Sequence, residues 1–391
     1  MLKHPAISIL EDLISICSVN PSLDEMSLGE APVADYIEGR CRRAGVKVSR
    51  QKVLSGRDNV IVEVDAGKRD TLLFDAHMDT VPIGEMPDAL TPIHRDGLLY
   101  GRGACDTKGS LAAMLAAMEE AALDPERLSC NLVMCCSVDE EYGMRGIRAF
   151  VQQRMSIAAA VVGEPTGLQI VIAHKGDLCF QIETRGKAAH SSVPHTGDSA
   201  ISQMVKVLRF IEDQVQPGLA RIHHELCGSS TLVVGKISGG TQANIVPEKC
   251  TVEIDRRLVP GEDVQQVMDR FTESLSEAMS GQGVTFSMKE LFRESPMSTE
   301  PSAPIVTHAR HVAQSMSLDS TLIGVPFGCH ASTLQHRGGI PCIVFGPGSV
   351  AVAHSSTEHV PLVQVERAAQ FYGVLTRTFR LDGNSNDQIP R

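Results

Sequence analysis

Short apolar runs that alternate with helix-forming segments are the feature of this sequence that most restricts its fold. The runs over 70–77 (DTLLFDAH), 131–138 (NLVMCCSV) and 158–163 (AAAVVG) are separated by helix-like segments, of which 108–123 is the richest in strong helix formers. A strand buried on both faces is a continuous apolar run, and a helix connects it to a parallel neighbour. The sequence therefore predicts an α/β domain whose mostly parallel sheet is covered by helices on both faces.

Further elements of the same style occur near both ends of the chain. Apolar residues three to four positions apart predict helices over 5–17, 30–44, 145–153, 302–316 and 361–379. Additional strands are expected in VKVSRQKV, NVIVEVDA and PCIVFGPG. Because the first and last parts of the chain share this pattern, we expect them to form one domain.

The pattern changes near Lys175 from buried apolar runs to alternation. In the segment DLCFQIETRG, the apolar residues Leu178, Phe180 and Ile182 occupy every second position. This period of two is typical of a strand in a sheet with one face in solvent. A domain of a different kind is therefore expected to begin here.

Two amphipathic helices and three further strands follow this alternating strand. The helices are predicted over 201–215 and 264–279, and the strands in STLVVGKIS, CTVEIDRRL and GVTFSMKEL. The resulting order, β-α-β-β-α-β, is that of a ferredoxin-like domain. We therefore expect a discontinuous catalytic domain, 1–174 and 292–391, interrupted by an inserted α+β domain over 175–291.

Charge and composition argue against several classes of function. The 391 residues include 36 basic and 47 acidic residues, and the net charge of −11 disfavours binding to nucleic acid or to an anionic membrane. No apolar stretch approaches the length of a membrane span. The eleven cysteines form no CxxC pairs and several lie in apolar runs, which predicts reduced thiols and a cytoplasmic location.

Histidines and carboxylates occur where the predicted strands end. His77 and Asp79 come at the end of one apolar run, and Glu164 follows another. Asp106 lies between a glycine-rich turn and a helix, but the glycine spacing matches neither GxGxxG nor GxxxxGK[ST], so a phosphate site is excluded. Taken singly, each of these residues could equally be a solvated loop residue or a helix N-terminal acid.

Two further strand ends carry the same types of residue. The strand NLVMCCSV leads directly into Asp139, Glu140 and Glu141, and three adjacent carboxylates need either solvent or a cation. His354 follows the strand in PCIVFGPG. Because five separate strand ends or loops repeat the pattern, we expect a shared metal site rather than coincidence.

The combined set of candidate ligands contains two imidazoles and three carboxylates: His77, Asp106, Glu141, Glu164 and His354. Such a set suits zinc, with manganese or cobalt as alternatives, and one bridging carboxylate could hold two ions. The residues therefore predict a hydrolytic site with two metal ions.

Eight motifs of this chain resemble those of the M20 metallopeptidase family, and they occur in the same order along nearly its whole length. They are DAHMDTVP, GRGACDTKGSLAAML, SVDEEYG, VVGEPTG, RGKAAHSSVP, GGTQANIVP, DRRLVPG and FGPGSVAVAH. The family includes acetylornithine deacetylase, succinyl-diaminopimelate desuccinylase, aminoacylases and glutamate carboxypeptidases. The resemblance implies the same two-domain architecture, with the inserted domain acting as a lid and a dimerisation module.

The resemblance also implies how the metal ions are shared. In this chain Asp106 would bridge two Zn²⁺ ions, His77 and Glu164 would bind one of them, and Glu141 and His354 would bind the other. The peptide bond between Asp106 and the next residue is often cis in the family, so a cis bond is expected there.

Three other residues match catalytic positions of the family. Asp79 would orient His77, and Glu140 would be the general base that takes a proton from the water between the metals and passes it to the leaving amine. His190, in the inserted domain, would stabilise the oxyanion in the active site of the partner subunit.

Substrate-binding positions are implied as well. Asn244 and Arg257 match lid residues that hold the carboxylate of the substrate, for which a guanidinium is suited, and Arg256 is an uncertain neighbour. His330 stands where the family usually has an acidic residue, close to the substrate, and this departure leaves the identity of the substrate open.

The resemblance therefore implies a zinc-dependent amidohydrolase that removes an acyl group from an N-acyl amino acid, most like acetylornithine deacetylase. A succinyl-diaminopimelate desuccinylase-like deacylase and an M20 dipeptidase or carboxypeptidase are the alternatives. A non-catalytic binding protein with the same fold is disfavoured because Glu140 and all the ligand positions are present. The expected partners are a small substrate and a second copy of the chain.

Overall fold

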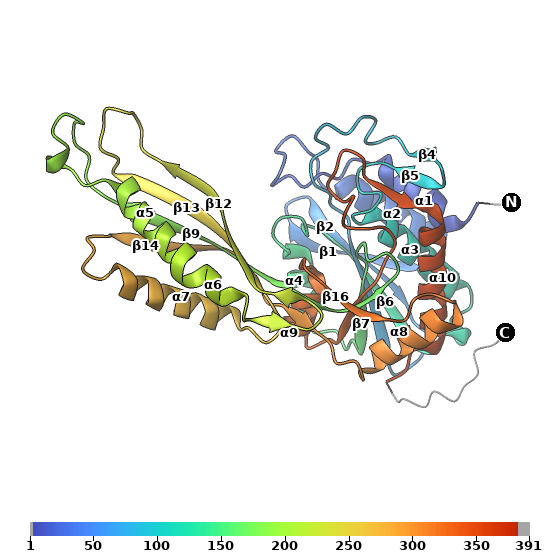
Figure 1. The fold of residues 1–391 in the computed structure, drawn as a ribbon. Helices are drawn as coiled ribbons and strands as arrows, with labels where there is room; N and C mark the ends of the chain where they lie inside the picture. The colour runs from blue at the N-terminus through green and yellow to red at the C-terminus, as the bar shows by residue number, and fades with distance from the viewer. Residues whose placement is uncertain (1–2, 382–391) are drawn as a thin grey trace. The chain divides into compact units, whose positions relative to one another are not determined.

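The computed structural model describes residues 3–381, and these residues form two compact units (Figure 1). The first unit consists of the segments Met1–Ile172, Thr299–Ile323 and Cys329–Arg391, as far as they are described. The second unit consists of Ala173–Ser298 and the short segment Gly324–Gly328. The chain therefore leaves the first unit, builds most of the second, returns, and later adds the short segment Gly324–Gly328 to the second unit.

The first unit is built on a mixed sheet whose centre is parallel. Its four parallel strands, in spatial order, are β6 (Asn131–Ser137), β3 (Thr71–His77), β7 (Ala159–Val162) and β17 (Cys342–Val344). The remaining strands lie outside these four: β1 (Lys47–Leu54), β2 (Arg57–Val64), β8 (Ile170–His174), β15 (Met297–Ser298) and β16 (Leu322–Val325). The strands β1, β2, β8 and β15 pair antiparallel. The predicted α/β class is confirmed, and the parallel arrangement is confined to the central strands.

Helices cover this sheet. They are α1 (Pro5–Ile14), α2 (Ala31–Arg43), α3 (Lys108–Leu123), α4 (Arg145–Gln152), α8 (Pro304–Ser315), α9 (His330–Gly338) and α10 (Leu362–Thr378), with a 3-10 turn at Pro125–Arg127. Helices α1, α3 and α10 pack on one another, and α4 packs on α9 (Figure 1). Residues 108–118 of α3 are all buried, because this helix is apolar around its whole circumference. Within the described part of the chain, no helix is both long enough and apolar enough to cross a membrane.

A small three-stranded sheet and helix α9 were not predicted from the sequence. The sheet consists of β18 (His359–Pro361), β5 (Leu98–Tyr100) and β4 (Ile93–Arg95). It places the segment that follows His354 beside the segment that precedes Asp106. Each of these strands has only three residues, which is too short for a periodic pattern to show in the sequence.

The second unit has the predicted order β-α-β-β-α-β. Its main elements are β9 (Gly176–Arg185), α5 (Ala200–Phe210), β12 (Thr231–Gly239), β13 (Lys249–Leu258), α7 (Val264–Met279) and β14 (Phe286–Glu294). Shorter elements are a 3-10 turn (Pro194–Thr196), a π turn (Ile211–Val215), α6 (Gln216–Leu219), β10 (His223–His224) and β11 (Gly228–Ser229). The antiparallel sheet has the order β12-β13-β9-β14.

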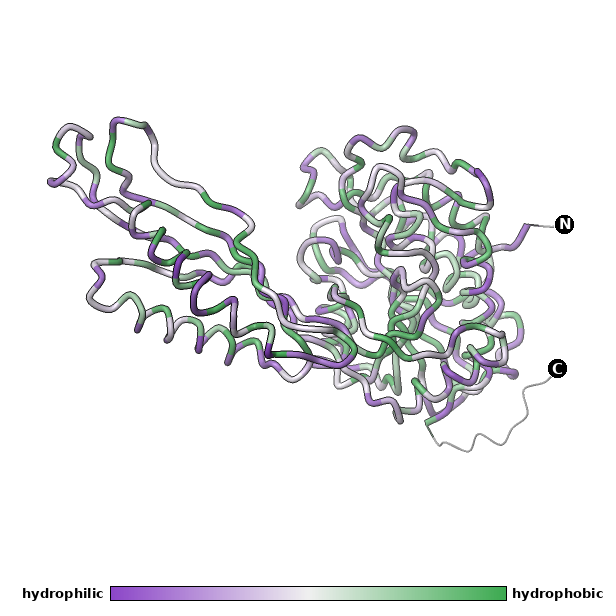
Figure 2. The backbone as a smooth tube through the Cα atoms, in the orientation of Figure 1, coloured by the Kyte–Doolittle hydropathy of each residue, from purple (hydrophilic) through white to green (hydrophobic). Residues whose placement is uncertain are grey.

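One face of this sheet carries the core of the second unit. Leu178, Phe180 and Ile182 of β9 are buried with apolar residues of α5 and α7, as their alternation predicted. Figure 2 shows hydrophobic and hydrophilic residues alternating along α7. The intervening residues of β9 lie on the opposite face of the sheet, which no helix of this unit covers.

Candidate metal centre

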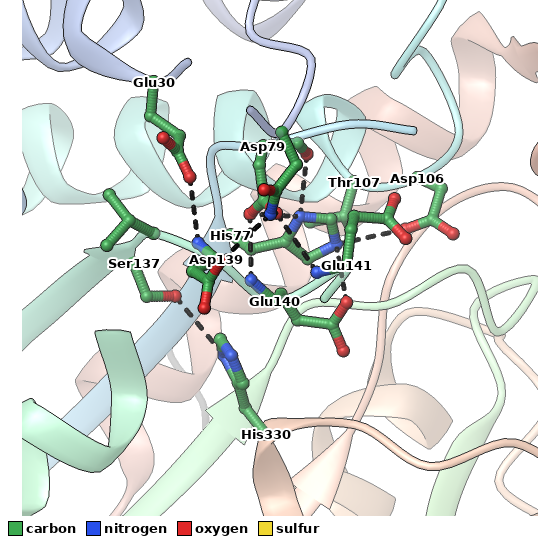
Figure 3. Close-up of polar contacts among 12 residues, drawn as sticks. Glu30, His77, Asp79, Asp106, Thr107, Ser137, Asp139, Glu140, Glu141 and His330 are labelled. Atoms are coloured by element: carbon green, nitrogen blue, oxygen red, sulfur yellow. Dashed lines mark hydrogen bonds and ion pairs between the residues drawn. The ribbon is translucent and has the colours of Figure 1, made fainter. Parts of the chain in front are cut away.

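Three of the candidate metal ligands, His77, Glu141 and Glu164, lie at or just past the ends of parallel strands, and Figure 3 shows His77 and Glu141 there together with Asp106. His77 is the last residue of β3, the acidic turn at 139–141 follows β6, and Glu164 follows β7. Since β6, β3 and β7 are parallel neighbours, their carboxyl ends meet at one edge of the sheet, where open α/β sheets bind their ligands. The fold thereby brings together residues that lie far apart in the sequence.

Asp106 lies between two histidines and presents one carboxylate oxygen to each. Its Oδ1 is 3.1 Å from Nε2 of His77, and its Oδ2 is 3.1 Å from Nε2 of His354. The turn before α3 holds it there, and in this turn Gly103 has a φ of 82° that favours glycine. The peptide bond between Asp106 and Thr107 is cis, as the resemblance implied. A carboxylate with a nitrogen at each oxygen is arranged to bridge two cations.

The imidazole of His77 is held in the tautomer that a metal ligand needs. Its Nδ1 is 2.9 Å from the main-chain oxygen of Asp79. Because a carbonyl oxygen only accepts, Nδ1 carries the hydrogen, and neutral His77 directs the lone pair of Nε2 towards Asp106. Two sets of lone pairs that face each other at 3.1 Å need a proton or a metal cation between them.

The candidate ligands fall into two groups that share Asp106. Nε2 of His77 is 4.0 Å from Oε1 of Glu164, and Nε2 of His354 is 3.3 Å from Oε2 of Glu141. The other oxygen of Glu141 is buried and has no hydrogen-bond partner among residues 3–381. A buried polar atom without a partner is unfavourable, and ligation of a cation would satisfy it. The donor set therefore fits divalent metal ions.

The charges of the cluster favour a cation as well. Burial raises the pKa of Glu141 to about 8, and the charge of Asp106 adds to this shift. Burial also raises the pKa of Glu164 well above its usual value. Hydrogen bonds to Asp106 and Glu141 raise the pKa of His354 to about 10. Without a cation the cluster would therefore retain protons, which a bound metal ion would displace.

Asp79 holds the turn that carries Glu140 and Glu141. Its Oδ1 accepts a hydrogen bond of 3.1 Å from the main-chain N–H of Glu140, and its Oδ2 accepts one of 3.1 Å from Glu141. Its Oδ1 is 3.6 Å from Nδ1 of His77, so the imidazole is oriented by the hydrogen bond that its Nδ1–H donates to the main-chain oxygen of Asp79. Asp79 thus contacts the histidine through its backbone and the acidic turn through its side chain.

A buried ionic network that was not predicted from the sequence supports the same turn. Arg57 makes two hydrogen bonds of 2.6 Å to Glu30 and one of 3.2 Å to Asp139. Asn20 donates to Asp79 at 2.7 Å and to Asp139 at 3.1 Å. Asn20 and Asp139 are 119 positions apart in the sequence, so no local motif marks this pair. The only local signal was Asp139 itself, an acidic residue at the end of a buried strand.

His330 lies beside this centre, at the start of α9 (Figure 3). Its Nδ1 is 2.8 Å from Oδ2 of Asp75 and 3.3 Å from Oγ of Ser137, and its ring centroid is 6.5 Å from that of His77. Burial opposes protonation, but the neighbouring Asp75 outweighs it and raises the pKa of His330. Nε2 is buried without a hydrogen-bond partner among the described residues. Asp75 thus supplies a carboxylate next to the position where the family usually has an acidic residue.

His190 and Asn244 lie next to each other on two loops of the second unit. His190 forms a β-bridge with Ile245, and the main-chain N–H of Ser191 donates to the oxygen of Asn244 at 3.0 Å. Both side chains are exposed. The main-chain N–H of Ser192 donates to Nδ1 of His190 at 3.2 Å, so the neutral imidazole carries its hydrogen on Nε2. His190 therefore presents a hydrogen-bond donor on the surface of this unit.

Arg257 is not brought next to Asn244. It lies near the end of β13, whereas the loop of Asn244 precedes the start of this strand, and eight residues of extended chain span about 27 Å. The guanidinium of Arg257 is bonded to Asp255 at 2.9 and 2.7 Å and lies 3.1 Å from Asp177. One substrate carboxylate cannot contact Asn244 and Arg257 of the same chain.

The sequence matches a known family over most of its length, namely peptidase family M20/M25/M40 over residues 73–378. It is 32% identical over 351 residues to an acetylornithine deacetylase of Myxococcus xanthus, which covers 86% of this chain and 89% of that one. It is 29% identical to a probable carboxypeptidase of Aspergillus oryzae, with coverage of 95% and 89%.

The fold is similar to that of the M20 family metallo-carboxypeptidase Sso-CP2 from Sulfolobus solfataricus. The TM-score is 0.81 over 95% of this chain and 98% of that one, at 19% identity. The fold and the sequence matches together define a hydrolase of amide bonds. The chain belongs to peptidase family M20/M25/M40.

Proposed function

We propose that this protein is a zinc-dependent amidohydrolase that removes the acyl group from an N-acyl amino acid, with acetylornithine deacetylase as the most similar activity. The observation that carries the proposal is the position of Asp106, which has an imidazole Nε2 at 3.1 Å from each carboxylate oxygen. The 32% identity to the acetylornithine deacetylase of Myxococcus xanthus supports the choice of substrate class.

Five residues would hold two Zn²⁺ ions, which Co²⁺ or Mn²⁺ could replace. Asp106 would be the shared ligand, His77 and Glu164 would hold one ion, and Glu141 and His354 would hold the other. The distances of 3.1 Å from Asp106 to each histidine and of 3.3 Å from His354 to Glu141 support the place of Asp106 between the ions and the pairing of His354 with Glu141. When bound, such ions lower the pKa of water and polarise the carbonyl group of the amide.

Glu140 is the proposed general base. Its Oε2 is 4.0 Å from Nε2 of His77, so it borders the ligand cluster. Burial raises the pKa of Glu140, whereas His77 and His330 act in the opposite direction. Glu140 takes a proton from water as the water oxygen bonds to the carbonyl carbon, and it gives this proton to the nitrogen as the C–N bond breaks. The products are a carboxylate and a free amine.

His190 is the proposed donor to the oxyanion that forms during this reaction. Its Nε2–H is exposed, as such a donor requires. Arg257 and Asn244 are proposed to bind the substrate. Arg257, however, is separated from the loops of Asn244 and His190 by eight extended residues of β13, a length of about 27 Å. A small substrate that needs both ends of β13 must obtain them from two chains. We therefore infer a homodimer in which His190 acts in the site of the partner.

Exposed apolar residues of the second unit support association between two copies. Ile201 and Val205 on α5 are 40% and 45% exposed, and Val233 and Ile237 on the edge strand β12 are each 57% exposed. A Cβ added at Gly240, directly after β12, would be 3.7 Å from Cδ1 of Ile201, so the end of β12 lies beside α5. Apolar side chains at a free strand edge favour pairing with another chain.

His330 is proposed to contact the substrate, because its Nε2 is buried beside the centre without a hydrogen-bond partner in the described part of the chain. Because the family usually has an acidic residue at the position of His330, two alternative activities stay open. One is a succinyl-diaminopimelate desuccinylase-like deacylase. The other is a dipeptidase or carboxypeptidase, which the relative in Aspergillus oryzae favours.

The eleven cysteines support a cytoplasmic location as part of the same proposal. All of them are free thiols, and nine of them are buried. Cys135 and Cys136 are fully buried, and burial raises the pKa of each thiol well above its usual value. Unreactive, reduced thiols of this kind are typical of a reducing compartment.

Hydrolysis of a panel of amides tests the proposed function. The panel contains N-acetylornithine, N-succinyl-diaminopimelate, N-acetylmethionine and a simple dipeptide, and the released amine is measured with zinc-loaded and chelator-stripped protein. We expect zinc-dependent turnover with the highest kcat/KM for N-acetylornithine. A higher kcat/KM for one of the other substrates would replace the proposed activity by the corresponding alternative. Activity that survives complete metal removal would overturn the mechanism.

A further inference from the structure

The carboxylate of Glu358 joins the two segments that carry Asp106 and His354. Glu358 is four residues after His354 and is completely buried. Its Oε1 accepts hydrogen bonds from the main-chain N–H groups of Cys105 at 2.9 Å and Asp106 at 3.0 Å. Its Oε2 accepts one from the guanidinium of Arg102 at 2.5 Å. Both oxygens are therefore engaged by the turn that precedes α3.

Other contacts of the same turn show that the loop of His354 is attached at both ends. The main-chain N–H of Gly101 donates to the main-chain oxygen of Glu358 at 3.3 Å. Sγ of Cys105 donates to the main-chain oxygen of Ser349, at the other end of the loop, at 3.3 Å. The position of His354 relative to Asp106 thus depends on this turn.

Glu358 does for the turn at Asp106 what Asp79 does for the turn at Glu140. Each is a buried carboxylate that accepts hydrogen bonds from two consecutive main-chain N–H groups of a segment that carries a candidate ligand. Each also receives a further hydrogen bond from a buried side chain, Arg102 or Asn20. Asp79 was expected from the motif that contains His77, whereas Glu358 was not.

We propose that Glu358 is a positioning residue of the metal centre, which keeps the carboxylate of Asp106 between His77 and His354. This inference rests on the proposed function, and it assigns no contact between Glu358 and the substrate or the metal. Without this carboxylate, two main-chain N–H groups and the guanidinium of Arg102 would lose their acceptor in a buried place. The turn would then shift to find other partners, and the bridging ligand would shift with it.

The variant Glu358→Gln tests this role because it keeps the size of the side chain and removes its charge. Titration of the metal-free protein with Zn²⁺ in a calorimeter should show an affinity about 10- to 100-fold lower than that of the wild type. The visible spectrum of the Co²⁺-substituted protein should also change, since it reports ligand geometry. Hydrogen exchange in the peptide that contains residues 101–107 should become faster.

Glu262→Gln provides a matched control in the second unit. Glu262 also joins a buried arginine to the main chain, with hydrogen bonds of 2.6 Å from Arg256 and 2.9 Å from the N–H of Val259. It contacts none of the five proposed ligands. We expect this variant to melt at a lower temperature and to bind Zn²⁺ as the wild type does.

Unchanged zinc affinity of Glu358→Gln, with a wild type that binds zinc, would overturn the role of Glu358 and leave the proposed function intact. A wild type that binds no zinc would overturn both. If Glu358→Gln does not fold, Glu358→Asp decides, because it keeps the charge but shortens the side chain by one methylene, so the carboxylate can no longer reach the N–H groups of Cys105 and Asp106 without moving the turn. Weaker zinc binding by Glu358→Asp would support the role, and wild-type binding would overturn it.

Discussion

The two units hold their candidate functional residues in opposite environments. In the first unit, His77 and Asp79 are buried, and the chain itself supplies the hydrogen bonds that orient them. In the second unit, His190 and Asn244 are exposed on loops, and Arg257 is bonded to acidic neighbours of its own sheet. The first group is a buried set of ligands whose donors fit divalent metal ions. None of the five candidate metal ligands lies in the second unit, so any contact of the second group with a substrate at the metal centre must involve groups from elsewhere.

This difference indicates where each unit obtains its specificity. A buried, hydrogen-bonded set of ligands is preorganised, so its geometry does not depend on the substrate. Exposed loops acquire a defined role only when a substrate or another chain contacts them. The first unit should therefore determine the chemistry, and the second unit should determine which substrate reaches it and in which assembly.

Substitution of the proposed base should produce the largest effect on the first unit. Glu140→Gln should lower kcat/KM by about 10²- to 10⁴-fold, because no other group takes the proton from water. Zinc content, measured by elemental analysis, should remain that of the wild type. Glu141→Gln is the matched control at the neighbouring position, and it should lose zinc. Wild-type turnover by Glu140→Gln would contradict the assignment.

Substitution of the proposed oxyanion donor should have the next largest effect on activity, and it tests the second unit. His190→Ala should lower kcat by about 10²- to 10³-fold because one donor to the developing charge is lost. His195→Ala, at another exposed histidine of the same unit, should leave kcat unchanged. Steady-state kinetics of both variants check this, and equal effects would remove the special role of His190.

Mixing two inactive variants tests whether His190 acts in the partner. When Glu140→Gln and His190→Ala chains are refolded together, one site in each mixed dimer contains both wild-type residues. About a quarter of the wild-type activity should then return, because half of the dimers are mixed and each has one complete site. If both residues act within one chain, no activity returns.

Removal of a side chain that supports Asp79 should have a smaller effect, which is expected in the zinc affinity of the first unit. Asn20→Ala removes the 2.7 Å hydrogen bond to Asp79 and should lower zinc affinity about 10- to 100-fold, as measured by calorimetry. Asn59→Ala is the control, since this buried asparagine bonds to the main chain of Val138 and Gly146 and to no proposed ligand. Wild-type zinc affinity of Asn20→Ala would show that the hydrogen bond from Asn20 is not needed to hold Asp79.

The smallest effect is expected at Arg257. Arg257→Lys keeps the charge but loses the planar fork that matches a carboxylate, so KM should rise about 10-fold with little change in kcat. Arg185→Lys, at an exposed arginine of the same sheet that pairs with Glu183, should leave KM unchanged. A fall in kcat without a change in KM would exclude a binding role for Arg257.

Much of the fold could be predicted because its signals are local. The apolar run 131–138 becomes β6, the segment from Lys108 becomes α3, and the alternation at Leu178, Phe180 and Ile182 becomes β9. Side-chain periodicity follows directly from the geometry of each element. Helix α9 and the strands β4, β5 and β18 were missed, since short elements depend on tertiary contacts rather than on their own pattern.

The candidate site could be predicted in part for the same reason. His77, Glu141 and Glu164 are adjacent to strongly apolar strands, so their position at the edge of the sheet follows from the sequence. Glu358 could not be found in this way, because its partner Arg102 is 256 positions away. A hydrogen bond between such distant residues exists only after the chain has folded.

The sequence by itself determined the classes of the two units, the order of their elements and the residue types at the strand ends. Periodicity and strand-end position are properties of neighbouring residues, and they survive without any knowledge of the fold. Only the tertiary structure decided that Asp106 lies between two imidazoles, that Glu358 holds its turn, and that Arg257 is far from Asn244 along β13. These are distances between remote parts of the chain, and packing sets them.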